Sequence, residues 1–186
     1  MSDKFNFIGV LNIPNTLTLA RIIIIPIFIT TIVYRRYDLS LFLFISAALT
    51  DLLDGLIARL KNQRTMIGTF LDPLADKFLL VSSFVVLSIY DFIPKWITIV
   101  VISRDVIVVV GWFLLYIIFG LLKVEPSILG KITIWVQSFF IIHILLNINV
   151  NFVPDLNKIL IYLTSVVTIG SGLEYIFKGL KVTHEK

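Results

Sequence analysis

Long apolar runs alternate with short polar segments along this chain. Residues 22–33 and 78–90, for example, contain no charged side chain. Runs that approach the ~20 residues needed to cross a bilayer predict membrane-spanning helices, because a helix satisfies its own backbone hydrogen bonds in lipid. The pattern predicts six such helices, over residues 17–33, 39–59, 74–90, 94–119, 127–146 and 158–178.

The polar segments mark the ends of these helices. Residues 35–38 and 91–94 have the composition of tight turns. Pro26 lies inside the first helix and is expected to kink it. We divide the chain into a juxtamembrane segment (1–16), a single membrane domain (17–181) and a C-terminal tail (182–186).

Composition supports lipid as the natural solvent. Of 186 residues, 58% are hydrophobic and only 15% charged, which is more apolar surface than a soluble domain of this length can bury. The absence of cysteine excludes disulfides, thiolate metal sites and cysteine nucleophiles. The net charge of +4 is not accompanied by mixed basic and aromatic clusters, so we expect no nucleic-acid partner.

Positively charged residues predict the orientation of the helices. Six spans place both termini on one side of the membrane, and Lys and Arg concentrate on the cytoplasmic side. With a cytoplasmic N-terminus, only Arg35, Arg36, Lys95 and Lys158 fall on the opposite side. We therefore expect both termini, and the loop after the second helix, to face the cytoplasm of a bacterial inner membrane.

Four aspartates flank that loop: Asp51 and Asp54 precede it, and Asp72 and Asp76 follow it. Spacings of three and four residues place each pair on one helix face. A charged side chain in a bilayer costs about 2.5–3.5 kcal/mol on insertion scales, so positive charge must compensate the cluster. Carboxylate oxygens suit Mg²⁺ or Mn²⁺, which also bind substrate phosphates. Purely structural ion pairs and a divalent-cation channel or transporter are the alternatives.

The same segment resembles the signature of the CDP-alcohol phosphotransferase family. The matching positions, at the family's spacing, are Asp51, Asp54, Gly55, Ala58, Arg59, Gly68, Asp72 and Asp76. The resemblance extends to "NIPNTLTLAR", "LDPLADK" and "ISRDV", and it weakens after Gln137.

The resemblance implies an all-α fold of six transmembrane helices around a polar cavity open to the cytoplasm, usually in a homodimer. It implies transfer of a phosphatidyl group from CDP-diacylglycerol to an alcohol, with release of CMP. Asp51, Asp54, Asp72 and Asp76 would bind Mg²⁺ or Mn²⁺, in a site for two ions, and Asp76 would also act as general base. The implied donor-binding residues are Asn15, Thr18, Arg21, Asp51, Gly55, Arg59, Thr65 and Gly68.

The acceptor alcohol is expected to carry a phosphate, and this needs cations. Arg104 in the fourth helix and Lys131 in the fifth are the candidates. Alternatively, Arg104 pairs with Asp105 or with an aspartate of the site, and Lys131 is an interfacial anchor. Glycerol-3-phosphate is the expected acceptor, with phosphatidylglycerol as the alternative.

Two further polar residues lie within apolar helices. His143 has no partner at metal-ligand spacing and is expected to be a packed, hydrogen-bonded histidine. Glu174 is expected to pair with Lys178, four residues later on the same helix.

Overall fold

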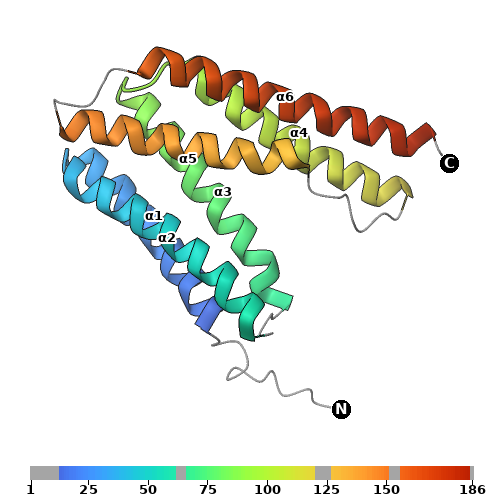
Figure 1. The fold of residues 1–186 in the computed structure, drawn as a ribbon, viewed down its shortest axis with the longest axis horizontal. Helices are drawn as coiled ribbons and strands as arrows, with labels where there is room; N and C mark the ends of the chain where they lie inside the picture. Colours follow the sequence, from blue (N-terminus) through green and yellow to red (C-terminus); the bar gives the residue numbers. More distant parts are fainter. Residues whose placement is uncertain (1–12, 62–65, 120–126, 151–155, 185–186) are drawn as a thin grey trace. The chain divides into compact units, whose positions relative to one another are not determined.

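The computed structural model describes the backbone of residues 13–61, 66–119, 127–150 and 156–184, and the side chains of residues 19–50, 75–118, 127–150 and 156–181. The described backbone is helical apart from short turns, which confirms the all-α class (Figure 1). The helices are α1 (Ile13–Val33), α2 (Tyr37–Lys61), α3 (Met66–Ile89), α4 (Lys95–Phe119), α5 (Ile128–Asn149) and α6 (Asn157–His184).

The largest boundary difference is the start of α3. The apolar pattern predicts a start at residue 74, whereas the helix begins at Met66. The prediction followed the apolar run, but helical hydrogen bonding continues through the more polar turns that precede it. Asp72 and Asp76 therefore lie within α3 and not at its start.

The chain forms two compact units, Met1–Val86 and Leu87–Lys186. In the first unit α1 packs against α2 (Figure 1). The rings of Phe28 and Phe44 meet between these helices with centroids 5.9 Å apart, and both side chains are fully buried. The hydroxyls of Thr31 and Ser40 are hydrogen-bonded at 2.8 Å, so a polar contact accompanies the aromatic one.

The predicted turn between α1 and α2 is confirmed, and a Schellman motif forms it. The Arg36 N–H donates to the Thr31 carbonyl at 2.8 Å, and the Arg35 N–H donates to the Ile32 carbonyl at 3.0 Å. Arg35 has a φ of 58°, the left-handed conformation that this motif requires after a helix. The turn after α3 has the same form, with Asp91 at a φ of 57°.

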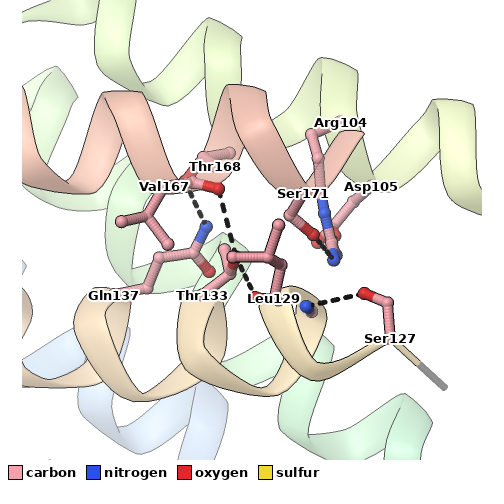
Figure 2. A network of polar contacts seen from close by, with 10 residues as sticks. Arg104, Asp105, Ser127, Leu129, Thr133, Gln137, Val167, Thr168 and Ser171 are labelled. Atoms are coloured by element: carbon pink, nitrogen blue, oxygen red, sulfur yellow. Dashed lines mark hydrogen bonds and ion pairs between the residues drawn. The ribbon is translucent and has the colours of Figure 1, made fainter. Parts of the chain in front are cut away.

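In the second unit α6 packs against both α4 and α5. Phe140, Ile141 and Leu145 of α5 are fully buried. A polar seam lies beside this apolar core: Gln137 donates to the Thr168 hydroxyl at 3.1 Å, and the Thr133 hydroxyl donates to the Val167 carbonyl at 3.4 Å (Figure 2). Such interhelical hydrogen bonds join helices where lipid supplies no hydrophobic driving force.

Three helices of the second unit are long and apolar enough to cross a membrane, over Lys95–Ile118, Ile128–Asn149 and Asn157–Lys181. The described parts of α1 and α2 contain shorter apolar stretches, Leu19–Val33 and Tyr37–Thr50. Large apolar side chains remain exposed along α4, including Ile99, Phe113 and Ile117. The chain is an integral membrane protein, and the number of six spans stays a prediction.

Candidate active site

Asp76 of α3 is paired with Arg21 of α1. The Arg21 Nη1 atom donates to Asp76 Oδ1 at 2.6 Å, which joins residues 55 positions apart. The Arg21 side chain has 0% exposure, whereas the Asp76 side chain has 31%. The guanidinium is therefore enclosed by protein, while the carboxylate remains partly accessible.

The register of α1 explains why Arg21 points inward. Arg21, Phe28 and Ile32 are all fully buried and recur at the seven- and four-residue spacings of one helix face. Ile23 and Ile27, on other faces, are exposed. A charge enclosed in this way needs an opposite charge, and Asp76 supplies it.

The other predicted metal and donor residues have side chains outside the described part of the structure. The backbone is helical at all of them except Thr65, which lies outside the described residues altogether. Their roles stay predictions. This group comprises Asn15, Thr18, Asp51, Asp54, Gly55, Arg59, Thr65, Gly68 and Asp72.

Arg104 of α4 occupies a second polar centre (Figure 2). Its Nη1 donates to Asp105 Oδ1 at 2.8 Å, and its Nη2 donates to Ser171 Oγ at 2.7 Å. The pairing of Arg104 with Asp105, one of the sequence-based alternatives, is confirmed. The side chain is 11% exposed, so most of this cation lies between helices.

Glycines make room for the Arg104 side chain. A Cβ atom on Gly130 would lie 3.3 Å from Arg104 Nη2 and 3.0 Å from Ser127 Oγ. A Cβ atom on Gly172 would lie 3.4 Å from Arg104 Cγ. Arg104 thus reaches from α4 to the first turn of α5 because both neighbouring helices lack a side chain there.

The first turn of α5 lies beside this centre. Ser127 is the N-cap and accepts from the Gly130 N–H at 2.8 Å. Lys131 follows Gly130, and its side chain is exposed. A helix N-terminus beside an arginine is favourable for an anion. The exposure of Lys131 is compatible with phosphate binding and with interfacial anchoring.

Sequence reasoning missed Gly130, Ser171 and Gly172 as neighbours of Arg104. The signal was the run of small residues, Gly-Ser-Gly, at positions 170–172 within an apolar helix. Small residues in such a helix allow close approach of a neighbouring helix. The pattern does not say which helix approaches, and so it could not identify Arg104.

The two remaining polar predictions have different outcomes. The pair between Glu174 and Lys178 is confirmed, with Oε1 and Nζ 2.8 Å apart. His143 is buried as expected, but its Nε2 atom has no hydrogen-bond partner among the described residues.

The four predicted metal ligands suit a hard divalent cation. Asp51 and Asp54 lie three residues apart on the helical backbone of α2, and Asp72 and Asp76 lie four apart on that of α3. All four would offer carboxylate oxygens, the ligands that Mg²⁺ and Mn²⁺ prefer. Of these four aspartates, only Asp76 has a described side chain. The described side chains contain no group of three or more His, Cys, Asp or Glu residues that could hold a metal ion.

The helical membrane fold and the spacing of the four aspartates define a class of membrane enzyme. Comparison with known families identifies this class. The family model for CDP-alcohol phosphatidyltransferases matches residues 11–170. The chain belongs to this family. The match continues well past Gln137, where the sequence resemblance was expected to weaken, and includes the α6 residues up to the start of the Gly-Ser-Gly run.

Several individual members of the family are similar to this chain. The chain is 35% identical over 179 residues to the CDP-diacylglycerol--glycerol-3-phosphate 3-phosphatidyltransferase of Aquifex aeolicus, a match that covers 92% of this chain and 98% of the relative. It is 35% identical to the Bacillus subtilis protein of the same name, covering 90% and 95%. Human cardiolipin synthase (CMP-forming) is 44% identical over 102 residues, covering 54% of this chain and 34% of the relative.

Proposed function

We propose that this protein transfers the phosphatidyl group of CDP-diacylglycerol to glycerol-3-phosphate, forming phosphatidylglycerophosphate and CMP in phospholipid biosynthesis. The observation that carries the proposal is similarity along nearly the whole chain to two proteins named for this reaction. Family membership also favours a transferase over a cation transporter that uses the same aspartates.

Asp76 has the role of general base in the proposed reaction. Its carboxylate accepts the proton of the acceptor hydroxyl, whose oxygen attacks the β-phosphorus of the donor. The bond from that phosphorus to the bridging oxygen breaks, and CMP leaves with the electron pair. The partial exposure of Asp76 supports this role, since an enclosed carboxylate could not meet a substrate.

The remaining aspartates complete a metal site in this proposal. Asp51, Asp54, Asp72 and Asp76 would bind two Mg²⁺ or Mn²⁺ ions, which when bound supply positive charge to the diphosphate. Of the donor residues implied by the family signature, Arg21 contacts Asp76. The proposed donor-binding residues are the others: Asn15, Thr18, Asp51, Gly55, Arg59, Thr65 and Gly68.

Arg104 and Lys131 bind the acceptor phosphate in this proposal. The supporting geometry is the Arg104 guanidinium beside Gly130, in the first turn of α5. A guanidinium donates hydrogen bonds to phosphate oxygens, and the positive N-terminal end of a helix dipole favours an anion. Lys131, one position further along α5, adds a flexible positive charge.

A CMP-forming cardiolipin synthase is the second candidate, with phosphatidylglycerol as acceptor. Similarity to the human enzyme of that name supports it. The Arg104-Asp105 pair adds support, because the residues "SRDV" around it resemble the cardiolipin branch.

Location and assembly complete the proposal. We place the protein in the bacterial cytoplasmic membrane as a homodimer, with both termini and the active site on the cytoplasmic side. The distribution of Lys and Arg supports the orientation, and family resemblance supports the dimer.

An acceptor screen tests the function. The purified protein is incubated with CDP-diacylglycerol, Mg²⁺ or Mn²⁺, and either glycerol-3-phosphate or phosphatidylglycerol, and both CMP and the lipid product are measured. We expect CMP and phosphatidylglycerophosphate with the first acceptor. CMP with phosphatidylglycerol alone would support the cardiolipin alternative, and no CMP with any acceptor would contradict a transferase. Divalent-cation flux into liposomes without CDP-diacylglycerol would instead favour a transporter.

A further inference from the structure

Arg21 contacts the proposed general base directly, although the family signature places it among the donor-binding residues. Its Nη1 atom lies 2.6 Å from Asp76 Oδ1, a short, charge-assisted hydrogen bond between α1 and α3. Contact with Asp76 and contact with the diphosphate are different roles, and they predict different kinetic effects.

Burial distinguishes these two roles. The Arg21 side chain has no exposed surface, and its Nε atom is also enclosed. Asp76 retains the exposed surface of the pair. A substrate that approaches from the accessible side therefore meets the carboxylate, with the guanidinium behind it.

The α1 face that carries Arg21 is a packing face. Phe28 and Ile32 share it, and both are fully buried. On α3, Ala75 and Leu79 flank Asp76 and are also buried. The contact therefore lies among buried side chains, which have little freedom to rotate.

Resting on the proposed function of Asp76, we propose that Arg21 is a positioning residue that acts through this carboxylate. Its hydrogen bond to Oδ1 fixes the rotation of the carboxylate, so that Asp76 meets the acceptor hydroxyl in one orientation. Arg21 does not contact the cytidine diphosphate in this proposal. Misplacement of a reacting group by about 1 Å can lower a rate about 100-fold.

The test separates turnover from donor binding. Arg21→Gln is expected to lower kcat about 100-fold while the Kd for CDP-diacylglycerol in nanodiscs changes less than about twofold. Arg21→Lys, which keeps the charge but loses the planar fork, should give an intermediate kcat. A donor Kd that rises as much as kcat falls, or a kcat that does not fall, would overturn the positioning role.

Arg36→Gln is the matched control. Arg36 also pairs with an aspartate, Asp38, at 3.6 Å, but both side chains are largely exposed. Its removal should leave kcat and donor affinity unchanged, because exposed pairs contribute little.

A double variant tests the proposal if the single variant Arg21→Gln does not fold. If Arg21→Gln is not monodisperse, combining it with Asp76→Asn removes both charges of the pair and leaves no isolated buried charge. In that background Arg21→Gln should reduce neither the residual kcat nor the donor affinity further; a further loss of either would overturn the proposal. Wild-type protein that forms no CMP would instead contradict the proposed function itself.

Discussion

Arg21 and Arg104, one in each compact unit, are both largely enclosed by protein and pair with aspartates in different ways. Arg21 is fully enclosed and contacts Asp76 on another helix. Arg104 is slightly exposed and contacts its own neighbour Asp105 as well as the Ser171 hydroxyl. In the proposed mechanism Arg21 orients a carboxylate that reacts, whereas Arg104, held in place by its partners, would bind the acceptor phosphate. Removal of Arg21 should therefore lower kcat, whereas removal of Arg104 should raise the KM for the acceptor.

The largest expected effect is at the carboxylate of the first pair. Asp76→Asn should lower kcat by about 10³-fold, within the range attributed to general acid–base catalysis. Donor affinity should largely persist, because the variant removes one of four proposed metal ligands. CMP release and equilibrium binding of CDP-diacylglycerol measure the two quantities. As a control, Asp91→Asn alters an exposed carboxylate near Lys95 and should preserve both. Near-normal turnover in Asp76→Asn would remove the base assignment.

At the second arginine, the effect should be on acceptor binding. Arg104→Gln should raise the KM for glycerol-3-phosphate about 10- to 100-fold, consistent with about 1.5–3 kcal/mol for a hydrogen bond to a charged group. The donor KM should change little. Initial rates at varied concentrations of each substrate check this. Equal changes in both constants would leave Arg104 with no specific link to the acceptor and would favour a structural role.

Glycine substitution tests whether the position of Arg104 matters as well as its charge. In Gly130→Ala the new Cβ would lie 3.3 Å from Arg104 Nη2, which donates to Ser171, while Nη1 of the same guanidinium donates to Asp105. The guanidinium must shift, and the acceptor KM should rise about fivefold, an effect of about 1 kcal/mol. Gly170→Ala is the control, because nothing lies within 4 Å of its new Cβ. Equal acceptor KM values in the two variants would show that Arg104 tolerates displacement.

The contrast between the Arg21–Asp76 and Arg104–Asp105 pairs also shows which features could be predicted from the sequence. Apolar runs predicted the helices, since lipid requires each span to satisfy its own backbone, but they missed the beginning of α3 because its early turns are more polar. The i, i+1 position of Asp105 made its pairing with Arg104 an expected alternative. The Arg21–Asp76 contact could not be predicted, because pairing across 55 residues depends on where the fold places α1 and α3. The four-aspartate cluster stays a prediction, since three of its side chains lie outside the described residues.

The smallest expected effect concerns the second partner of Arg104. Ser171→Ala removes the hydroxyl that accepts from Nη2, while Asp105 continues to orient the guanidinium through Nη1. The acceptor KM should therefore rise only about threefold, near the lower part of the range for one hydrogen bond. Ser165→Ala is a matched control on α6, since that buried hydroxyl donates to the Ile161 carbonyl of its own helix. If Ser171→Ala matched Arg104→Gln in effect, the serine would determine the guanidinium position, and Asp105 would contribute little to it.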